Sequence, residues 1–288
     1  MVSLIYYSVT IHNLKFVFLQ SKTKNITIMK RRRSGGLKIR LLLFAGIALF
    51  SLFKFYSNTE VNPYTGKKQH VTLTPNEEVR MGLQSAPRMA QQHGGLHPNH
   101  EYQALVDRVG NKLISSSEEA RNSPYRYDFH LLRDPQTINA FALPGGQIFI
   151  TYALFSKLKT EDQLAGVLGH EIGHVLGRHS AERMAKHGLT QGLITAVMAG
   201  GGGEAGQMAA QIGNMINMKY GRQDELESDD LGVKYLINAG YNPEDMIGVM
   251  KILKASSGGN RVPEFQSTHP DPENRIEHIK AAIKKYSN

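Results

Sequence analysis

The stretch TEDQLAGVLGHEIGHVL, residues 160–176, decides the fold. Its apolar residues recur at the spacing of one helix face, and Thr160 with Gln163 has the spacing of an N-terminal capping box. The stretch therefore predicts a capped helix that begins just after Thr160 and buries one apolar stripe. That stripe consists of Leu164, Val167, Leu168, Ile172, Val175 and Leu176.

Within this helix, residues 170–174 are His-Glu-Ile-Gly-His. Residues four apart share one face of a helix, so the imidazoles of His170 and His174 can reach one metal ion. Glu171 is displaced around the helix, close enough to hold a metal-bound water without being a ligand. Zinc acidifies such a water and polarises a carbonyl, and Glu171 can take the proton and pass it on. The pattern favours a hydrolytic zinc site over two histidines on a surface helix.

A catalytic zinc site needs a third protein ligand and one open position. One pattern would place a histidine six residues after His174, but that position is Ser180, and His179 misses it by one. The other candidate is a carboxylate on a later helix. The stretch RQDELESDDLGV holds Glu225 and Asp229 four residues apart. Glu225 is the predicted third ligand, and Asp229 is predicted to accept the second N–H of a ligand histidine.

The charge of the chain is concentrated at its N-terminus. Nine of the 34 Lys and Arg residues lie in residues 1–40, which hold no Asp or Glu. The remaining 25 basic residues balance the 25 acidic ones. This distribution is typical of a targeting or membrane-flanking segment, so we expect no nucleic-acid partner. The absence of cysteine excludes disulfides, thiolate metal sites and cysteine nucleophiles.

The N-terminal segment indicates a membrane anchor. MKRRRSGGLKIR begins at Met29 and precedes an apolar run from Leu41 to Phe53. The run spans roughly 20 Å at about 1.5 Å per residue, and Phe55 and Tyr56 can extend it toward the thickness of a bilayer. No A-x-A site follows, so an uncleaved anchor is favoured over a cleaved signal and over a buried core helix.

Met29 is also the predicted initiator, so residues 1–28 are expected to be a misread upstream extension that is not part of the protein. Residues 29–56 are then the basic region and the signal or anchor segment, residues 57–74 a polar linker, and residues 75–288 the folded domain. Under the positive-inside tendency, the basic flank stays in the cytoplasm and the domain is exported.

Alternation of apolar and polar residues predicts a half-buried strand over Tyr125–Leu131, and GQIFIT (146–151) predicts a second strand. Two helical stretches are expected on either side of HGGLHPNH (93–100), a loop whose histidines lack the spacing of a metal site. Residues 188–218 are predicted to form two packed helices joined at Gly200–Gly203, because neither arm reaches the length of a membrane span.

Two later helices are predicted to begin at Asn242-Pro243-Glu244 and at Asp271-Pro272-Glu273, each with an N-cap residue followed by Pro. On the helix that carries the histidines, His179 and His187 are expected to face solvent.

Four motifs taken together resemble metallopeptidase family forty-eight. They are NAFALPGG (139–146), HEIGHVLGRHSAERM from His170, the Glu225–Asp229 pair and STHP (267–270), in the order that family shows. The resemblance covers roughly residues 61–284. It implies one zinc ion per chain, held by His170, His174 and Glu225, with Glu171 as the catalytic base. It also implies an α+β fold, a mostly helical zincin-type domain with a small antiparallel sheet beside the zinc helix.

The resemblance further places Asn139, Ala140, Phe141, Gly145 and Gly146 at the edge of the active-site cleft. An exposed strand edge can bind an extended peptide through its backbone, and the glycines would let that peptide approach closely. His269 is expected near the metal, where it can donate to an oxyanion, fill the open zinc position, or serve packing alone. Arg275 is a candidate brace for the loop of His269.

The function expected from these residues is a membrane-tethered zinc endopeptidase that hydrolyses unfolded or damaged proteins of the cell envelope. The alternative is a chaperone-like binding module that keeps the zinc fold and cleaves little, although such a module has no need of Glu171. The expected location of the domain is periplasmic or extracytoplasmic, and the acid-free N-terminus leaves the mitochondrial inner membrane as a second possibility. Oligomeric state and cleavage preference do not follow from the sequence.

Overall fold

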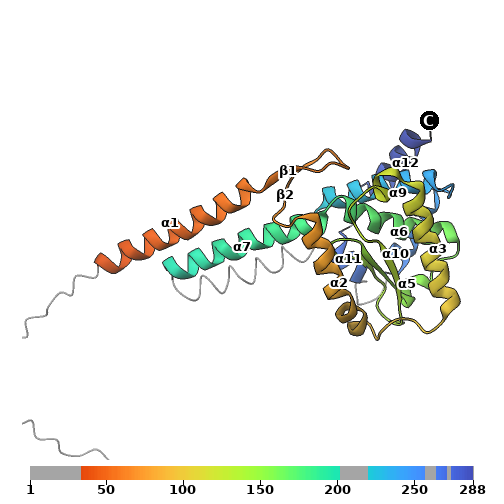
Figure 1. The fold of residues 1–288 in the computed structure, drawn as a ribbon, viewed down its shortest axis with the longest axis horizontal. Helices are drawn as coiled ribbons and strands as arrows, with labels where there is room; N and C mark the ends of the chain where they lie inside the picture. Colours follow the sequence, from red (N-terminus) through yellow and green to blue (C-terminus); the bar gives the residue numbers. More distant parts are fainter. Residues whose placement is uncertain (1–33, 202–219, 257–263, 271–273, 288) are drawn as a thin grey trace, which may run out of the picture.

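The computed structural model describes residues 34–201, 220–256, 264–270 and 274–287 of the chain. Figure 1 shows a compact mixed body from which two long helices project together. The helices are α1 (Ser34–Ser57), α2 (Pro75–Gln92), α3 (His100–Ser116), α4 (Glu118–Arg121), α5 (Tyr152–Phe155), α6 (Glu161–Leu176), α7 (His179–Gly201), α9 (Arg222–Asn238), α10 (Asp245–Ala255), α11 (Glu264–Thr268) and α12 (Arg275–Tyr286). The strands are β1 (Thr59–Val61), β2 (Lys68–His70), β3 (Asp128–Leu132), β4 (Ala140–Ala142) and β5 (Gln147–Thr151).

Helix α6 is the central element of the body. It packs against α9, α10 and α3 and against strands β4 and β5. Thr160 caps it as predicted, with Oγ1 accepting from the N–H of Gln163 at 3.1 Å, while the Gln163 side chain accepts from the N–H of Lys159. Every residue from Gln163 to Leu176 is buried. The predicted single apolar stripe is therefore too narrow a description, because neighbours cover α6 on all sides.

The sheet beside α6 has the strand order β3-β5-β4. Strand β4 is antiparallel to β5, whereas β3 is parallel to β5. The predicted α+β class is confirmed, but this sheet is mixed and not purely antiparallel. The reason is the path of the chain after β3. It crosses to the far edge of the sheet to form β4, and the turn after β4 then brings β5 back between β3 and β4. Strand β5 is buried at every residue, and β4 forms an edge of the sheet.

The segment interpreted as a polar linker is instead partly an ordered hairpin. Strands β1 and β2 pair antiparallel, and two buried side chains of this segment satisfy carbonyls at the end of α6. Asn62 Nδ2 donates to the carbonyl of Leu176 at 2.8 Å, and Gln69 Nε2 donates to that of Gly177 at 2.5 Å. Such carbonyls have no partner within the helix, which is why the hairpin folds onto this point.

Arg178 joins the hairpin to the end of α6. Its φ of 55° breaks the helix between α6 and α7. Its guanidinium pairs with Glu60 and with Glu78 of α2, and it donates to the carbonyl of Leu73 at 2.5 Å. This residue therefore holds the N-terminal segment, α2 and the central helix together.

Helices α1 and α7 lie side by side and antiparallel (Figure 1). Within the described residues, α1 is the helix that is long and apolar enough to cross a membrane, judged by length and composition alone. The first of the two helices predicted within 188–218 is the outer half of α7, and the predicted second helix lies outside the described residues. Residues 1–28 and 29–33 are likewise outside them.

The two predicted helices on either side of residues 93–100 are confirmed as α2 and α3, and the two predicted strands as β3 and β5. Helix α10 begins at Asp245, later than Pro243 predicts, because its first turn is bonded from residue i+3 to residue i: the N–H of Met246 donates to Pro243 and that of Ile247 to Glu244. Helix α12 begins at Arg275, and residues 271–273 lie outside the described part of the chain.

Candidate metal centre

His170 and His174 lie one turn apart on α6 and direct their Nε2 atoms to one place, where these atoms are 3.1 Å apart. Both side chains are almost fully buried, with 3% and 1% exposure. Two imidazole nitrogens this close in a buried position are the arrangement that a metal ion bridges. The helical spacing predicted from the sequence is thus present in the structure.

Glu225 reaches the same place from α9. Its Oε2 lies 3.4 Å from Nε2 of His170, and its Oε1 lies 3.5 Å from Nε2 of His174. The approach of α9 depends on Gly173, because a Cβ at that position would lie 2.8 Å from Cα of Ser228. The glycine within the HEIGH motif therefore lets the second helix come close enough to deliver the carboxylate.

Asp229 lies one turn after Glu225 and holds His170 from behind. Its Oδ1 is 2.9 Å from Nδ1 of His170, as the sequence predicts. Arg275 of α12 in turn donates to Asp229 at 2.6 Å and 2.9 Å, so it braces this carboxylate. Burial lowers the pKa of His170, but the Asp229 and Glu225 carboxylates outweigh it and raise that pKa to about 9.

His179 holds His174 in the same manner, and the prediction that it faces solvent is wrong. Its side chain is fully buried, and its Nδ1 lies 2.9 Å from Nδ1 of His174. Its Nε2 lies 2.8 Å from Oε2 of Glu227. The break at Arg178 turns the chain between α6 and α7 and carries His179 inward, which simple helical spacing does not anticipate. His187 is exposed, as predicted.

Glu171 stands beside this group with both carboxylate oxygens buried and without a hydrogen bond from the described residues, although its Oε1 lies 3.8 Å from Nε2 of His269. Burial raises its pKa, and the nearby charges of His269 and His170 offset that effect only in part. A buried carboxylate without donors is costly, so the site is built for something that the chain itself does not supply. Oε2 of Glu225 and Nε2 of His269 likewise make no hydrogen bond within the described part of the chain. These atoms fit a cation and a water.

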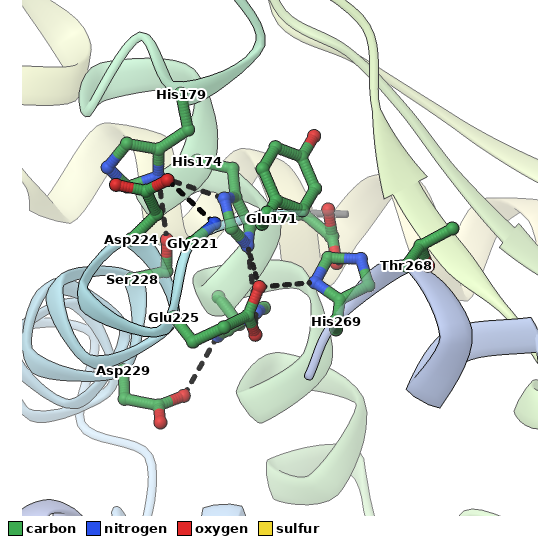
Figure 2. A network of polar contacts seen from close by, with 12 residues as sticks. Glu171, His174, His179, Gly221, Asp224, Glu225, Ser228, Asp229, Thr268 and His269 are labelled. Atoms are coloured by element: carbon green, nitrogen blue, oxygen red, sulfur yellow. Dashed lines mark hydrogen bonds and ion pairs between the residues drawn. The ribbon is translucent and has the colours of Figure 1, made fainter. Parts of the chain in front are cut away.

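His269 completes the group. It follows α11, with its backbone N–H bonded to Phe265 at 2.7 Å, so it ends a helical turn and does not lie in an extended loop. Its Nδ1 is 3.1 Å from Oε1 of Glu225, and its ring stacks on Phe265 with centroids 4.3 Å apart. Figure 2 shows Glu225 lying between His174 and His269. One ligand atom from each of His170, His174, Glu225 and His269 lies within 4.8 Å of the others.

Tyr220 is a part of the site that the sequence did not indicate. Its ring stacks on that of His174 with centroids 4.1 Å apart, and its hydroxyl lies 2.9 Å from Oγ of Ser180. Arg183 lies over its other face. Tyr220 comes just before α9, and no spacing in the sequence connects a tyrosine there with a histidine on α6.

The residues predicted for the cleft edge divide into two sets. Ala140 and Phe141 belong to β4, the edge strand that packs against α6. Asn139 precedes them and donates through Nδ2 to Glu264 of α11 at 3.3 Å. This set lies where an extended chain could add to the sheet.

The second set, Gly145 and Gly146, has a different role from the one predicted. Their φ values of 81° and 111° form the turn from β4 to β5. A Cβ at Gly145 would lie 2.3 Å from Cα of Val79, and one at Gly146 would lie 2.8 Å from the carbonyl of Arg126. The glycines are required by contacts within the chain, and they do not leave room for a substrate backbone.

Other groups of ligand-type side chains have partners of their own. His179, Asp224 and Glu227 also come within reach of one another, but the ammonium of Lys67 lies 3.0 Å from Asp224 and 3.4 Å from Glu227. In the 93–100 loop, His93 bonds to Asp134 and His97 stacks on Tyr152.

Comparison with known proteins places this geometry in a class. Over 288 residues, 92% of this chain and 79% of the relative, the chain is 27% identical to the mitochondrial metalloendopeptidase OMA1 of Saccharomyces cerevisiae. It is 30% identical over 234 residues to the beta-barrel assembly-enhancing protease of Escherichia coli, covering 77% of this chain and 47% of that protein. It is 30% identical over 185 residues to the metalloprotease YcaL of Escherichia coli, covering 61% of this chain and 70% of the relative.

The fold, the His-Glu-x-x-His helix and these relatives define the class of the protein, which is a metalloprotease. A family model for peptidase family M48 matches residues 100–283, and the chain belongs to that family. Its members depend on a metal, and the buried histidines and Glu225 form a group able to bind one. The chain spans about half the length of the beta-barrel assembly-enhancing protease.

Proposed function

We propose that the chain is a zinc endopeptidase that holds one zinc ion through His170, His174 and Glu225. Two imidazoles and a carboxylate are a donor set typical of catalytic zinc. The observation that carries the proposal is Glu171, whose two oxygens are buried beside this group and accept no hydrogen bond from the described residues. When bound, zinc would polarise the scissile carbonyl and make water a better nucleophile near neutral pH.

The remaining chemistry belongs to Glu171. Its carboxylate takes a proton from the attacking water and delivers it to the nitrogen of the leaving amine. Burial raises its pKa, which makes it a stronger base than an exposed carboxylate and a competent acid in the second step. Asp229 and His179 hold the two imidazoles in the orientation that leaves their Nε2 atoms free for the metal.

The test is casein cleavage by the full chain, purified in detergent with zinc, beside Glu171→Gln. The expected loss is at least about 100-fold, the usual contribution of a general base. Glu161→Gln, at the partly exposed start of the same helix and away from the metal group, is the matched control and should cleave like the parent. Persistent cleavage in Glu171→Gln would contradict the assignment. Zinc binding and casein capture without cleavage by the parent would favour the chaperone-like binding module.

Polypeptide recognition through the edge of β4 supports a broad substrate range. The N–H of Leu143 bonds to Gln147 and that of Thr151 to Asn139, so the alternate residues, Ala140 among them, direct their backbone groups away from β5. Ala140 is fully buried in this structure, so an extended peptide would pair there once the part that covers this edge has moved away. Such pairing depends little on side chains, which suits unfolded or damaged proteins of the cell envelope. Casein-derived peptides N-methylated at alternate residues should then be cleaved more slowly than the unmodified peptides. Equal rates would exclude edge pairing.

His269 is inferred to keep the site closed. It is fully buried and belongs to the group that can surround one ion, so it fills the position that a substrate carbonyl needs. Substrate access would then require His269 and α11 to move away. The alternative role, an oxyanion donor, would use Nε2 of His269, which makes no hydrogen bond within the described residues.

Membrane anchoring through α1 is part of the proposal. The helix exposes large apolar side chains, Leu42 at 72% and Phe53 at 70% among them. Basic residues precede it, so the body should lie on the extracytoplasmic side, in the periplasm of a bacterium. A reporter fused after residue 56 and scored for export would test this. Its import into mitochondria instead would favour the mitochondrial inner membrane.

A further inference from the structure

We propose that the outer half of α7, residues 188–201, enters the bilayer beside α1, so that the protein is held by a helical pair. This inference rests on the proposed anchoring by α1 and goes beyond it. By sequence, α7 is not a membrane span, because its first half is polar and its apolar part is short. The structure adds that this short apolar part lies against the apolar part of α1.

The two helices pack through small residues. A Cβ at Gly192 would lie 2.7 Å from Cβ of Ser51, and one at Gly200 would lie 2.8 Å from Cβ of Phe44. Ala196, one turn from each glycine on the same face of α7, is fully buried. Three small residues spaced four apart let two backbones approach closely, and this packing holds helices together in lipid, where the hydrophobic effect cannot.

The uncharged parts of the two helices lie at the same level. On α1 they run from Arg40 to Lys54, and on α7 they begin after Lys186. Because Ser51 faces Gly192 and Phe44 faces Gly200, the uncharged end of α7 lies along the uncharged centre of α1. Arg40 at one end and Lys54 at the other place cationic groups at the levels expected for lipid headgroups.

The outward face of α1 is apolar, as a bilayer requires, and that of α7 carries Met198 and Thr195, whose hydroxyl is bonded to the carbonyl of Gln191. Leu49 and Phe50 of α1 are 66% and 67% exposed, and Met198 of α7 is 52% exposed. By contrast, Ile47, Ala48, Ser51, Leu52 and Phe55 of α1 are partly buried. One face of α1 is therefore occupied by α7, and the remaining faces suit lipid.

This arrangement would fix the catalytic body at the membrane. Only Gly177 and Arg178 separate α6 from α7, and the first turns of α7 rise about 15 Å between the metal group and residue 188 at 1.5 Å per residue. The ordered β1–β2 hairpin already joins α1 to the end of α6, and a second helix joined directly to the metal-binding helix would further hold the body at one height and orientation. The proposed consequence is a preference for polypeptides presented at the membrane surface.

The chain has no cysteine, so single cysteines can report the position of each residue in membranes containing the full chain. Met184 and Met198 lie on nearly the same face of α7 and are 39% and 52% exposed, which makes them a matched pair. With a membrane-impermeant maleimide applied to both sides of opened vesicles, Met184→Cys should react at least about 10-fold faster than Met198→Cys. The two should react equally after unfolding in dodecyl sulfate. Leu42→Cys reports on the anchor itself and should be protected.

Equal labelling of the two α7 cysteines with Leu42→Cys protected would place α7 in water and overturn the inference, while leaving the anchor intact. Rapid labelling of Leu42→Cys as well would contradict the anchoring on which it rests. Protection of Met198→Cys that disappears on dilution in detergent would assign this face to a second copy of the chain, which also overturns it.

Pairing is tested by disulfide formation. Ser51→Cys with Gly192→Cys should cross-link on oxidation in membranes, because the two positions are in contact and the helices need to separate by only about 1 Å to reach the Cβ–Cβ distance of a disulfide. The exposed pair Leu49→Cys with Thr195→Cys is the control and should not. Failure of the first pair to cross-link, with Met198→Cys protected, would show that α7 does not enter the bilayer against α1.

Discussion

The Nδ1 atoms of His174 and His179 lie 2.9 Å apart, and one of them must carry the proton that joins them. Nε2 of His179 lies 2.8 Å from Oε2 of Glu227, a carboxylate whose pKa is lowered because hydrogen bonding and charge from His179 outweigh burial. Glu227 therefore accepts a hydrogen bond from Nε2–H of His179, whose Nδ1 then accepts from Nδ1–H of His174. This chain leaves Nε2 of His174 with a free lone pair, directed at the metal group.

His179→Ala is expected to weaken zinc binding about 10- to 100-fold, the usual effect of removing a partner that orients a ligand histidine. Zinc affinity measured by competition with a chelator checks this directly. His187→Ala is the matched control, because His187 is exposed on the same helix. Unchanged affinity in His179→Ala would show that His174 keeps its tautomer without this partner.

His269→Ala is expected to raise the rate of casein cleavage several-fold at saturating zinc. The reason is the proposed closed site, in which His269, a member of the group that can surround one ion, fills the position that a substrate needs. The rate should rise while zinc affinity falls, since one donor is lost. A fall in kcat with unchanged zinc affinity would instead assign His269 to the oxyanion of the tetrahedral intermediate.

Arg275→Ala is expected to destabilise the metal-free chain by about 3–5 kcal/mol, the cost of breaking a buried ion pair from one side. Arg275 is 4% exposed and donates twice to Asp229, so its loss leaves that carboxylate buried beside Glu225. Chemical denaturation checks the size of the effect. Lys280→Ala on the same helix should change stability little, because its pair with Glu277 is exposed.

The metal group follows largely from the sequence, because its determinants are local. His170 and His174 are set by helical spacing, and Glu225 and Asp229 by the same spacing on a second helix. Their meeting also needs close packing of two helices, and the sequence records this only as Gly173 opposite Ser228. No residue of the motif marks Tyr220, since its contact with His174 arises from the entry of the chain into α9.

Two of the errors have different physical causes, and the first is that a turn changes the face on which the next residues lie. His179 was expected on the surface by continuing the helix through Arg178, where the backbone adopts φ 55°. The 57–74 segment is polar, yet Asn62 and Gln69 use that polarity to bond helix-end carbonyls in a buried position. Polar composition predicts a linker only when no unsatisfied backbone group is near.

Because the pKa of His170 is raised, the stability of the metal-free chain and the affinity for zinc should depend on pH in opposite directions. In the metal-free chain that pKa is raised from 6.5 to about 9, so the stability it contributes is complete below pH 6.5 and is lost as the pH rises through about 9. Zinc needs the deprotonated imidazole, so zinc affinity should rise over the same range and binding at pH 7.5 should release a proton. Calorimetric titration in two buffers of different ionisation enthalpy measures that proton. Asp229→Asn removes a carboxylate that raises this pKa, so fewer protons should be released when that variant binds zinc. Equal proton release by the variant and the parent would show that another group carries the proton.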